Sequence, residues 1–309
     1  MPEVGKPIGR AIAPNATDAM NYRHAFHAGN FADVVKHAAL ARILARLAQK
    51  ETPFRVLDTH AGIGLYDLAG LEAEKTGEWR DGIGRVLAAP FAPPVAALLE
   101  PWLAAVARVN GLTSPAHLAP DRLAVYPGSP LVARAGLRRG DHAVFTELHP
   151  ADAARLADLF AGDGRVRVVE LDGWLALKSF LPFKERRGLV VVDPPFEKPG
   201  EFDRLTRGLV EATRRFAHAV YLLWYPIKDR REVARWHDAL AATGLRRLLA
   251  VDFAVAEPRP DGPLTACGLV IHNPPWKLDE DLAALVPALC DRLALDASAS
   301  ADLRWIVPE

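Results

Sequence analysis

Runs of consecutive apolar residues alternate along the chain with segments whose apolar positions recur every three or four residues. The runs predict strands buried on both faces of a sheet, and the periodic segments predict helices with one buried face. We expect strands at residues 54–58, 142–147, 165–172, 188–193 and 218–224. We expect helices at residues 31–50, from residue 150, at 201–216 and at 229–243. This alternation predicts an α/β fold with a mostly parallel, Rossmann-like sheet.

The pattern changes in two places. Residues 246–257 and 265–272 predict two strands joined by a Pro/Gly turn, hence an antiparallel hairpin near the C-terminal end of the sheet, followed by an amphipathic helix at 279–293. Between about residues 72 and 124 no buried strand of the expected kind occurs, while 93–110 has helical periodicity. A small helical insertion is therefore expected there.

The N-terminal end predicts an arm followed by the folded domain. Residues 1–19 lack periodicity and contain three prolines, which favours a flexible arm and leaves residues 20–309 as one domain. Asn30 can cap the helix that begins at Phe31, and Asp33 in the first turn suits the helix dipole.

The strand at 188–192 ends in Asp193-Pro194-Pro195-Phe196. Two prolines cannot continue a strand ladder, so this corner delivers a carboxylate, a carbonyl and a ring to the carboxyl edge of the sheet, where open α/β folds bind ligands. Asp193 and the Pro194 carbonyl can accept hydrogen bonds from an exocyclic amine while Phe196 stacks on a flat base. The plainer interpretation is a Pro-rich turn with a capping acid.

Three other strands also end in polar or glycine residues. The first runs into a turn that contains Gly62 and Gly64, the second ends at Glu147, and the third at Asp172. A glycine turn followed by a helix, here expected at 65–71, is typical of nucleotide-binding units, and a terminal acid can hold ribose hydroxyls or an adenine amine. Because a P-loop lysine and a phosphate-binding GxGxxG motif are missing, S-adenosylmethionine is favoured over ATP or NAD.

Several further positions have competing interpretations. The row Arg42, Arg46 and Lys50 is typical of a solvated helix face, with phosphate contact as the second possibility. Ser129 can cap a helix that starts at Pro130. The second double-proline motif, at 273–276, is interpreted as a structural turn.

Composition narrows the class of protein. The chain has 309 residues, half of them hydrophobic, and zero formal net charge, which argues against an indiscriminate nucleic-acid binder. Its two cysteines, Cys267 and Cys290, form no disulfide framework, and His24 and His27 have no cysteine or acidic cluster beside them, so no metal site is expected. Without a transmembrane-length apolar run (~18 residues) or a signal segment, we expect a cytoplasmic protein with no membrane partner. We also expect a monomer.

With these residues in view, the chain resembles the bacterial 23S rRNA adenine-N6 methyltransferase J family from Met20 to the C-terminus. The motifs that carry the resemblance are NYRHAFHAGNFADVVKH at 21–37, DTHAG at 58–62, YPGSP at 126–130, ELHP at 147–150, DG at 172–173, DPPF at 193–196 and LWYP at 223–226. The resemblance implies a Rossmann-like methyltransferase core with a small helical subdomain, S-adenosylmethionine as cofactor and no metal. It implies 23S ribosomal RNA as the partner, as free RNA or an early precursor.

The resemblance also assigns roles to residues. Asp193 would engage the adenine amine, together with Pro194 and Phe196, and Tyr22 would lie against the RNA. Lys36, near the sheet edge, is a further predicted RNA contact. The family usually has Tyr where this chain has Phe196, a change that keeps stacking and loses any phenol hydrogen bond. The predicted cofactor contacts, to which the glycine turn adds Gly62, are His37, His60, Gly62, Ser129, Glu147, Asp172 and Gly173.

Other functions remain open on the residues alone. The corner at Asp193 could equally serve guanine-N2 methylation of rRNA. A non-catalytic RNA-binding or ribosome-assembly protein on the same fold is the alternative outside enzymes. Protein amine methylation is less favoured, because release-factor-type enzymes prefer Asn before the two prolines.

Overall fold

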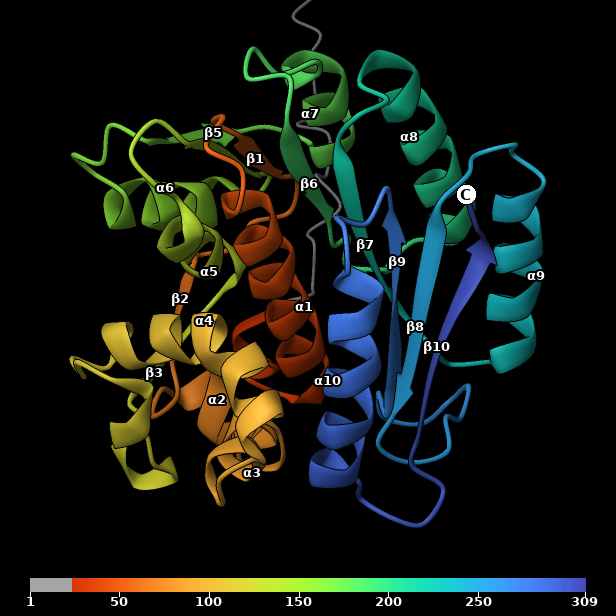
Figure 1. Ribbon diagram of the computed structural model, residues 1–309. Helices are drawn as coiled ribbons and strands as arrows, with labels where there is room; N and C mark the ends of the chain where they lie inside the picture. The colour runs from red at the N-terminus through yellow and green to blue at the C-terminus, as the bar shows by residue number, and fades with distance from the viewer. Residues whose placement is uncertain (1–23) are drawn as a thin grey trace, which may run out of the picture.

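An eight-stranded mixed sheet forms the centre of the structure, a computed structural model that describes residues 24–309 (Figure 1). In spatial order its strands are β10 (Ser300–Val307), β8 (Leu248–Ala254), β9 (Ala266–His272), β7 (Val220–Pro226), β6 (Gly188–Val192), β1 (Arg55–Asp58), β4 (His142–Glu147) and β5 (Val166–Glu170). The strands from β7 to β5 are parallel, whereas β9, β8 and β10 pair in antiparallel fashion. The predicted α/β fold and the C-terminal hairpin β8–β9 are confirmed.

The order of the parallel strands reverses at β1, which lies between β4 and β6. In open α/β sheets the crevice outside the carboxyl ends of the strands at such a reversal is where ligands bind. The register places Asp58 opposite Val191, and the Thr59 amide donates to the Val191 carbonyl at 3.1 Å. The turn after β1 and the corner at Asp193 therefore lie side by side.

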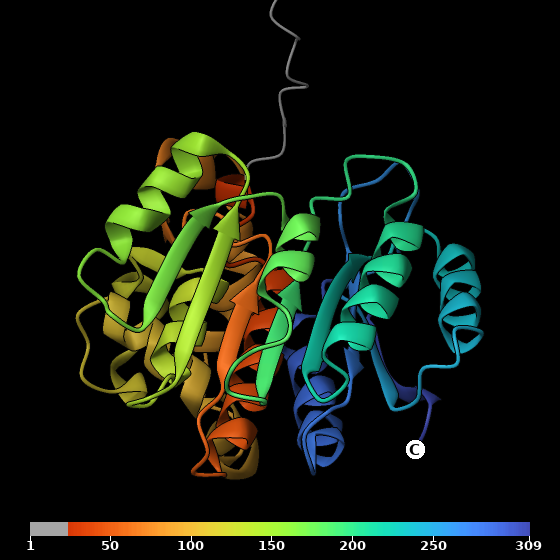
Figure 2. The same ribbon diagram turned by 90° about the horizontal axis from the view of Figure 1, so that it is seen from above.

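Helices cover both faces of the sheet (Figure 2). On β6, Leu189 and Val191 face one layer while Val190 and Val192 face the other, as strand alternation requires. The first layer contains α1 (Phe31–Ala48), α5 (Ser129–Gly136), α6 (Pro150–Leu159) and α10 (Leu278–Leu293). The second contains α7 (Gly173–Phe180), α8 (Glu201–Arg215) and α9 (Arg230–Ala241).

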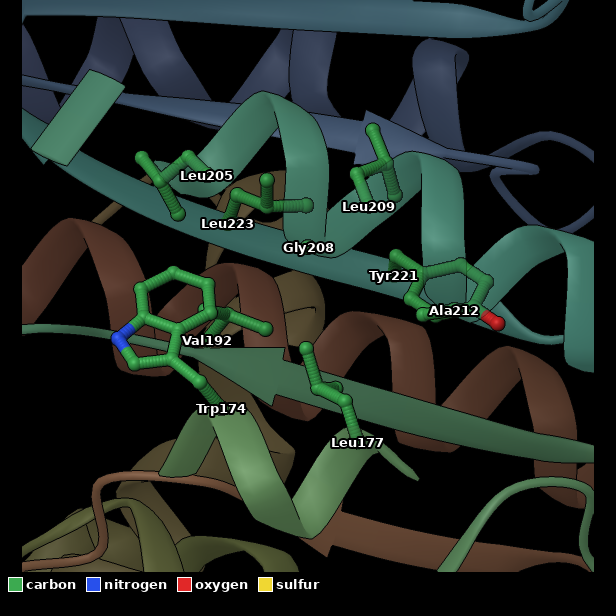
Figure 3. Close-up of a pocket in the computed structure, with 9 residues that line it drawn as sticks. All are labelled: Trp174, Leu177, Val192, Leu205, Gly208, Leu209, Ala212, Tyr221 and Leu223. Carbon is green, nitrogen blue, oxygen red and sulfur yellow. The ribbon is translucent and has the colours of Figure 1, made fainter. Parts of the chain in front are cut away.

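In the second layer, α7 and α8 lie close together over β6 and β7. Figure 3 shows Trp174 and Leu177 of α7 opposite Leu205 and Leu209 of α8. A Cβ atom at Gly208 would lie 2.6 Å from the Trp174 ring, so α8 needs glycine at this point of contact. The N-terminal ends of both helices are thus held at the carboxyl edge of the sheet.

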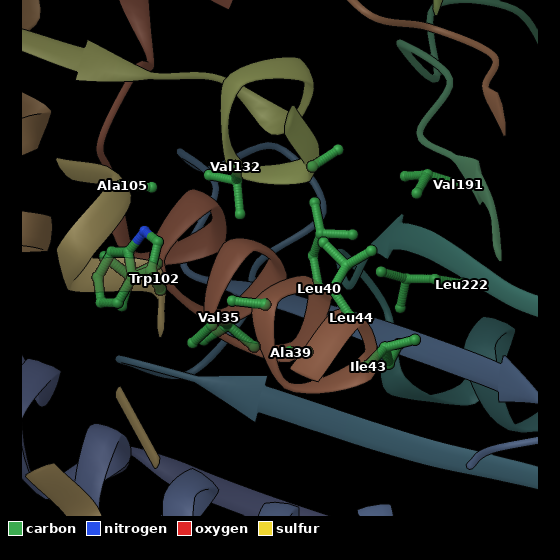
Figure 4. Close-up of a cluster of buried hydrophobic side chains, with 14 of the residues drawn as sticks. Val35, Ala39, Leu40, Ile43, Leu44, Trp102, Ala105, Val132, Val191 and Leu222 are labelled. Atoms are coloured by element: carbon green, nitrogen blue, oxygen red, sulfur yellow. The ribbon is translucent and has the colours of Figure 1, made fainter. Parts of the chain in front are cut away.

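In the first layer, α1 is enclosed on most sides. Figure 4 shows its side chains among Val132 of α5, Trp102 of α4 (Pro93–Val109), and Val191 and Leu222 of the sheet. The tight packing fixes where α1 presents its polar residues.

In the basic row on α1, Lys50 is exposed as a solvated face requires, but Arg42 and Arg46 have neither of their predicted roles. Arg42 and Arg46 both pair with Asp281 of α10, at 2.7 and 2.6 Å. Neither a solvated face nor a phosphate contact describes these two residues, because α10 covers them.

The insertion is closed at its base by two short strands. β2 (Leu65–Asp67) and β3 (Val125–Pro127) pair antiparallel on either side of it. The helix predicted at 65–71 was wrong: the apolar spacing of Leu65, Leu68 and Leu71 imitates a helix, yet Leu71 is 92% exposed and β3 draws Leu65–Asp67 into a strand. Besides α4, the inserted elements are α2 (Leu71–Thr76), η2 (Arg80–Gly84), α3 (Arg85–Leu87), η3 (Pro115–His117) and η4 (Pro120–Arg122).

Other local predictions had mixed outcomes. The Asn30 cap is confirmed, since its side chain accepts from the Asp33 amide at 3.0 Å. The N-cap of α5 is Gly128, so the predicted Ser129 cap was wrong. Edge strand β10 was not predicted, because its half-exposed residues include several charged ones.

The predicted arm at 1–19 and Tyr22 lie outside the described residues. No described helix is long and apolar enough to cross a membrane.

Candidate active site

A buried chain of charges leads from α1 to the end of β6. The Lys36 ammonium lies 2.5 Å from Asp193 Oδ2 and 3.0 Å from Asp33 Oδ1. His24 Nε2 lies 2.9 Å from Asp33 Oδ2, which also accepts from the Gly29 amide at 2.9 Å. Lys36, predicted to contact RNA, is only 4% exposed, and its ammonium is paired with Asp193 and Asp33.

The pairing fixes the charges in this chain. Burial alone would lower the pKa of Lys36, but the carboxylates of Asp193 and Asp33 outweigh it and hold that pKa well above its usual value. Burial would likewise raise the pKa of Asp33, yet His24, Lys36 and His37 keep it well below its usual value. Lys36 is therefore a cation and Asp33 an anion throughout the neutral range.

The corner after Asp193 holds its ring in a constrained position. Phe196 has φ of 52°, a left-handed conformation that is uncommon for a bulky residue and that clusters at functional sites. Its ring packs edge-on against Phe202 and Trp224, with centroids 5.2 and 6.1 Å away. Phe196 is only partly buried, so the ring remains available to a ligand.

The glycine turn after β1 is fastened to the neighbouring strand. The amides of Gly62 and His149 donate to the two Glu147 carboxylate oxygens at 2.9 and 2.8 Å. The Gly128 amide donates to the Gly64 carbonyl at 2.8 Å, which brings the start of α5 to the same turn. Gly62 has φ of 61°, and a Cβ there would lie 2.4 Å from the Tyr66 hydroxyl, so only glycine fits.

The start of α7 meets the same turn from the other side. A Cβ at Gly173 would lie 2.4 Å from the Thr59 carbonyl oxygen and 2.6 Å from His60 Cε1, so glycine permits this approach. Asp172 Oδ1 caps α7 by accepting from the amides of Trp174 and Leu175. Asp172 is thus a cap, as many strand-end acids are, with its second oxygen outside the cap.

Two buried polar atoms near this turn have no hydrogen-bond partner within residues 24–309: His37 Nε2 and Asp58 Oδ2. Burial lowers the pKa of His37 to about 3, so the ring is neutral, and its Nδ1 lies 2.9 Å from the Tyr126 hydroxyl. Burial raises the pKa of Asp58 to about 6, against the opposing effect of the Ser129 hydroxyl. Buried polar atoms of this kind are normally satisfied by a partner, here a ligand or water.

Of the predicted site residues that the structure describes, His60, Gly62, Glu147, Asp172, Gly173 and the Asp193 corner follow the carboxyl ends of β1, β4, β5 and β6, while Lys36, His37 and Ser129 come from the adjacent helices α1 and α5. Burial also lowers the pKa of His60 to about 4, and Asp193 and Asp172 act on this ring in the opposite direction. In the part of the chain from His24 onward, no group of three or more His, Cys, Asp or Glu side chains is arranged to hold a metal ion.

Sequence reasoning missed three contributors to this site. Asp58 ends a buried strand as Asp193 does, and that signal could have identified it. Asp33 was taken only as a first-turn acid; its i,i+3 spacing to Lys36 on the same helix was the available signal, whereas its contact with His24 depends on the fold of the preceding segment. Tyr126 had no separate signal, because its role depends on the tertiary approach of His37.

The second double-proline motif serves as a turn. The Asn273 side chain donates to the carbonyls of Ala217 and Ala219 at 2.7 and 3.2 Å, so its amide is engaged. The motif follows β9, which is antiparallel to β7, so it lies at the sheet edge opposite Asp193.

Known proteins match the chain over nearly its whole length. A family model described as ribosomal RNA large subunit methyltransferase D, RlmJ, matches residues 51–307. Two proteins named ribosomal RNA large subunit methyltransferase J, from Escherichia coli K12 and Haemophilus influenzae, are 40% and 39% identical to this chain. Each alignment covers 94% of this chain and 100% of the relative. The crystal structure of a protein from Legionella pneumophila superposes with a TM-score of 0.78 at 29% identity, covering 90% of this chain and 98% of that one. The chain belongs to the ribosomal RNA large subunit methyltransferase J family.

Proposed function

We propose that the protein transfers a methyl group from S-adenosylmethionine to the exocyclic N6 of an adenine in 23S ribosomal RNA. One observation carries the proposal: Asp193, with its double-proline corner, lies at the strand-order reversal beside the glycine turn after β1. The proposed amine acceptor and the proposed nucleoside-binding turn are therefore neighbours at the same edge of the sheet. Membership of the family supports the reaction class, and its named relatives methylate large-subunit rRNA.

The residues around the turn fit the cofactor. His37 Nε2 and Asp58 Oδ2 are buried without partners, which suits the charged amino-acid end of the ligand. Each Glu147 oxygen accepts one backbone hydrogen bond and keeps capacity for a ribose hydroxyl. Asp172 Oδ2 lies outside the α7 cap and can accept from an adenine amine, and Ser129, His60 and Gly173 border the same space. When bound, S-adenosylmethionine supplies an electrophilic methyl group on a sulfonium.

The target base would be held by the corner after β6. An adenine must leave its stack to reach this depth, and Phe196 offers a ring face for it. Lys36 occupies Asp193 Oδ2, so Oδ1 is the oxygen that can accept from the amine, alongside the Pro194 carbonyl. Two acceptors on one amine orient its lone pair away from the ring plane, and this alignment supplies much of the rate. The Asp193 carboxylate is placed to receive the proton that the amine loses.

Nucleoside analysis tests the reaction. Ribosomal RNA from a strain that lacks the protein should gain N6-methyladenosine when the purified protein and S-adenosylmethionine are added. Mass spectrometry that finds N2-methylguanosine instead would establish the guanine alternative. A parallel assay of naked 23S rRNA and assembled subunits would show whether free or precursor RNA is the substrate, and naked RNA is expected to react faster.

The Asp193→Ala variant tests the assigned site. Calorimetry should find cofactor affinity within a few-fold of wild type, because Asp193 is not among the residues proposed to contact the cofactor. Methyl transfer should be lost, because the acceptor for the amine is removed. Retained turnover in this variant would refute the assignment.

A further inference from the structure

The segment that precedes α1 lies between the insertion and the charged side chains that lead to Asp193. We call residues 24–30 the wall segment: it comprises the 3-10 turn η1 (His24–Phe26) and the loop to the Asn30 cap. His24 contacts Asp33, and its ring lies edge-on to Tyr66 with centroids 5.1 Å apart. Through Asp33 and Lys36 the wall segment connects to Asp193.

The wall segment is held from outside by Glu78 of the insertion. The Glu78 carboxylate oxygens each lie 3.0 Å from His27 Nδ1, and Oε2 also accepts from Asn30 Nδ2 at 2.9 Å. Asn30 thus uses its oxygen to cap α1 and its nitrogen to bind Glu78. A single carboxylate fixes both the middle of the wall segment and its junction with α1.

Neighbouring residues of the insertion reinforce this contact. The Ile83 amide donates to the Gly29 carbonyl at 2.9 Å, and the Thr76 hydroxyl donates to the Phe26 carbonyl. A Cβ at Gly82 would lie 2.0 Å from the Gly29 carbonyl oxygen, so the insertion backbone rests directly on the wall segment. Gly82 also kinks the π-helical turn η2, a feature that is frequent at functional sites.

We infer that Glu78 is a positioning residue for the RNA substrate, and that the insertion acts on the reaction by fixing the wall segment beside Asp193. The inference rests on the proposed function. Glu78 touches neither Asp193 nor the glycine turn; it acts through His27 and Asn30. The core holds α1 independently, so loss of Glu78 should loosen the wall segment and leave Lys36 and His37 in place.

The test compares Glu78→Ala with Glu74→Ala in the full-length protein. Glu74 is the matched control, because it belongs to the same insertion and its carboxylate, within residues 24–309, pairs only with exposed Arg80. In Glu78→Ala, hydrogen exchange of the amides at residues 26–30 should accelerate, and KM for an rRNA fragment should rise roughly tenfold as two hydrogen-bonded partners are lost. The kcat and the calorimetric Kd for S-adenosylmethionine should stay within about two-fold. Glu78→Gln, which keeps an acceptor for Asn30, should recover part of the KM.

Several results would overturn the inference. Unchanged exchange and KM in Glu78→Ala would show that the contact positions nothing. Parallel weakening of S-adenosylmethionine binding, or an equal effect of Glu74→Ala, would indicate general loosening of the fold. If wild-type protein forms no N6-methyladenosine, the proposed function fails, while the exchange measurement still reports on the contact itself.

Discussion

The ammonium of Lys36 lies 2.5 Å from the carboxylate of Asp193, although 157 positions separate the two residues along the chain. The ion pair joins α1, which carries the N-terminal motif, to the strand end where an amine would be bound. It also leaves one Asp193 oxygen free of Lys36, which sets the direction from which a substrate can approach. The site therefore depends on the packing of α1 as much as on the corner after β6.

Replacement of Lys36 by Met should both destabilise the protein and reduce its activity. The change leaves Asp33 and Asp193 as adjacent carboxylates at a buried position, and removal of one partner from a buried pair typically costs about 3–5 kcal/mol. Thermal unfolding should show a lowered Tm, and kcat should fall at least roughly tenfold. The double variant Lys36→Met, Asp33→Asn removes one of the two charges and should regain part of the Tm. A single variant with wild-type Tm would contradict the buried ion pair.

Replacement of Phe196 by Ala should weaken RNA binding. Stacking of a base on an aromatic ring is worth about 1–3 kcal/mol, so KM for an rRNA fragment should rise roughly tenfold or more. Phe196→Tyr keeps the ring and should remain close to wild type in KM. Equal KM values for Phe196→Ala and wild type would exclude this ring as the stacking surface.

Asp58 should make the protein less stable as the pH rises. Its folded pKa is about 6, above the ~3.9 of an unfolded aspartate, so the folded state binds more protons between these values. Stability contributed by this group is present below about pH 4 and is lost between about pH 4 and 6. Asp58→Asn should therefore raise stability at pH 7 by up to about 3 kcal/mol, with little gain at pH 4.

Denaturant unfolding at the two pH values measures this difference. The same variant should bind S-adenosylmethionine more weakly, because it loses a buried anion that suits the ligand's amino group. A stability gain that is equal at both pH values would show that burial of the Asp58 charge is not its cause.

Replacement of Arg46 by Ala should lower stability without affecting RNA affinity. Arg46 and Arg42 both pair with Asp281, so the row on α1 fastens α10 to the core. The Tm should fall, while the Kd for an rRNA fragment and its dependence on salt stay unchanged, because no phosphate contact is removed. If the Kd for RNA depended less steeply on salt concentration in this variant than in wild type, Arg46 would be a phosphate contact after all.

The sequence predicted the parallel strands and the strand-end residues well, for a physical reason. Strands buried on both faces appear as apolar runs, and parallel strands bring their carboxyl ends to one edge, so Glu147 and Asp193 could be placed together before any coordinates. The end of the strand at Asp193 could also be predicted, because two consecutive prolines cannot donate the backbone hydrogen bonds that continue a strand.

What the sequence could not give were contacts that depend on tertiary packing. Lys36 was predicted to contact RNA near the sheet edge, and only the packing of α1 shows that its ammonium is buried against Asp193. The sequence pattern placed Arg42 and Arg46 on a solvated helix face, whereas in the structure α10 packs over them. The strand β2 was hidden because Leu65–Asp67 takes its conformation from its partner β3 rather than from its own residues.

The pairing of β2 with β3 has a consequence for how this enzyme family can vary. Because β2 and β3 are paired, the insertion leaves the core and returns to it at adjacent points. The entropic cost of bringing these two points together rises only slowly with the length of the inserted chain, by about 0.6 kcal/mol for each doubling. Beyond the residues that contact the wall segment (76–83), homologues can therefore differ in the length of the insertion with little loss of stability, whereas changes at the contact itself would reach the reaction through residues 24–30.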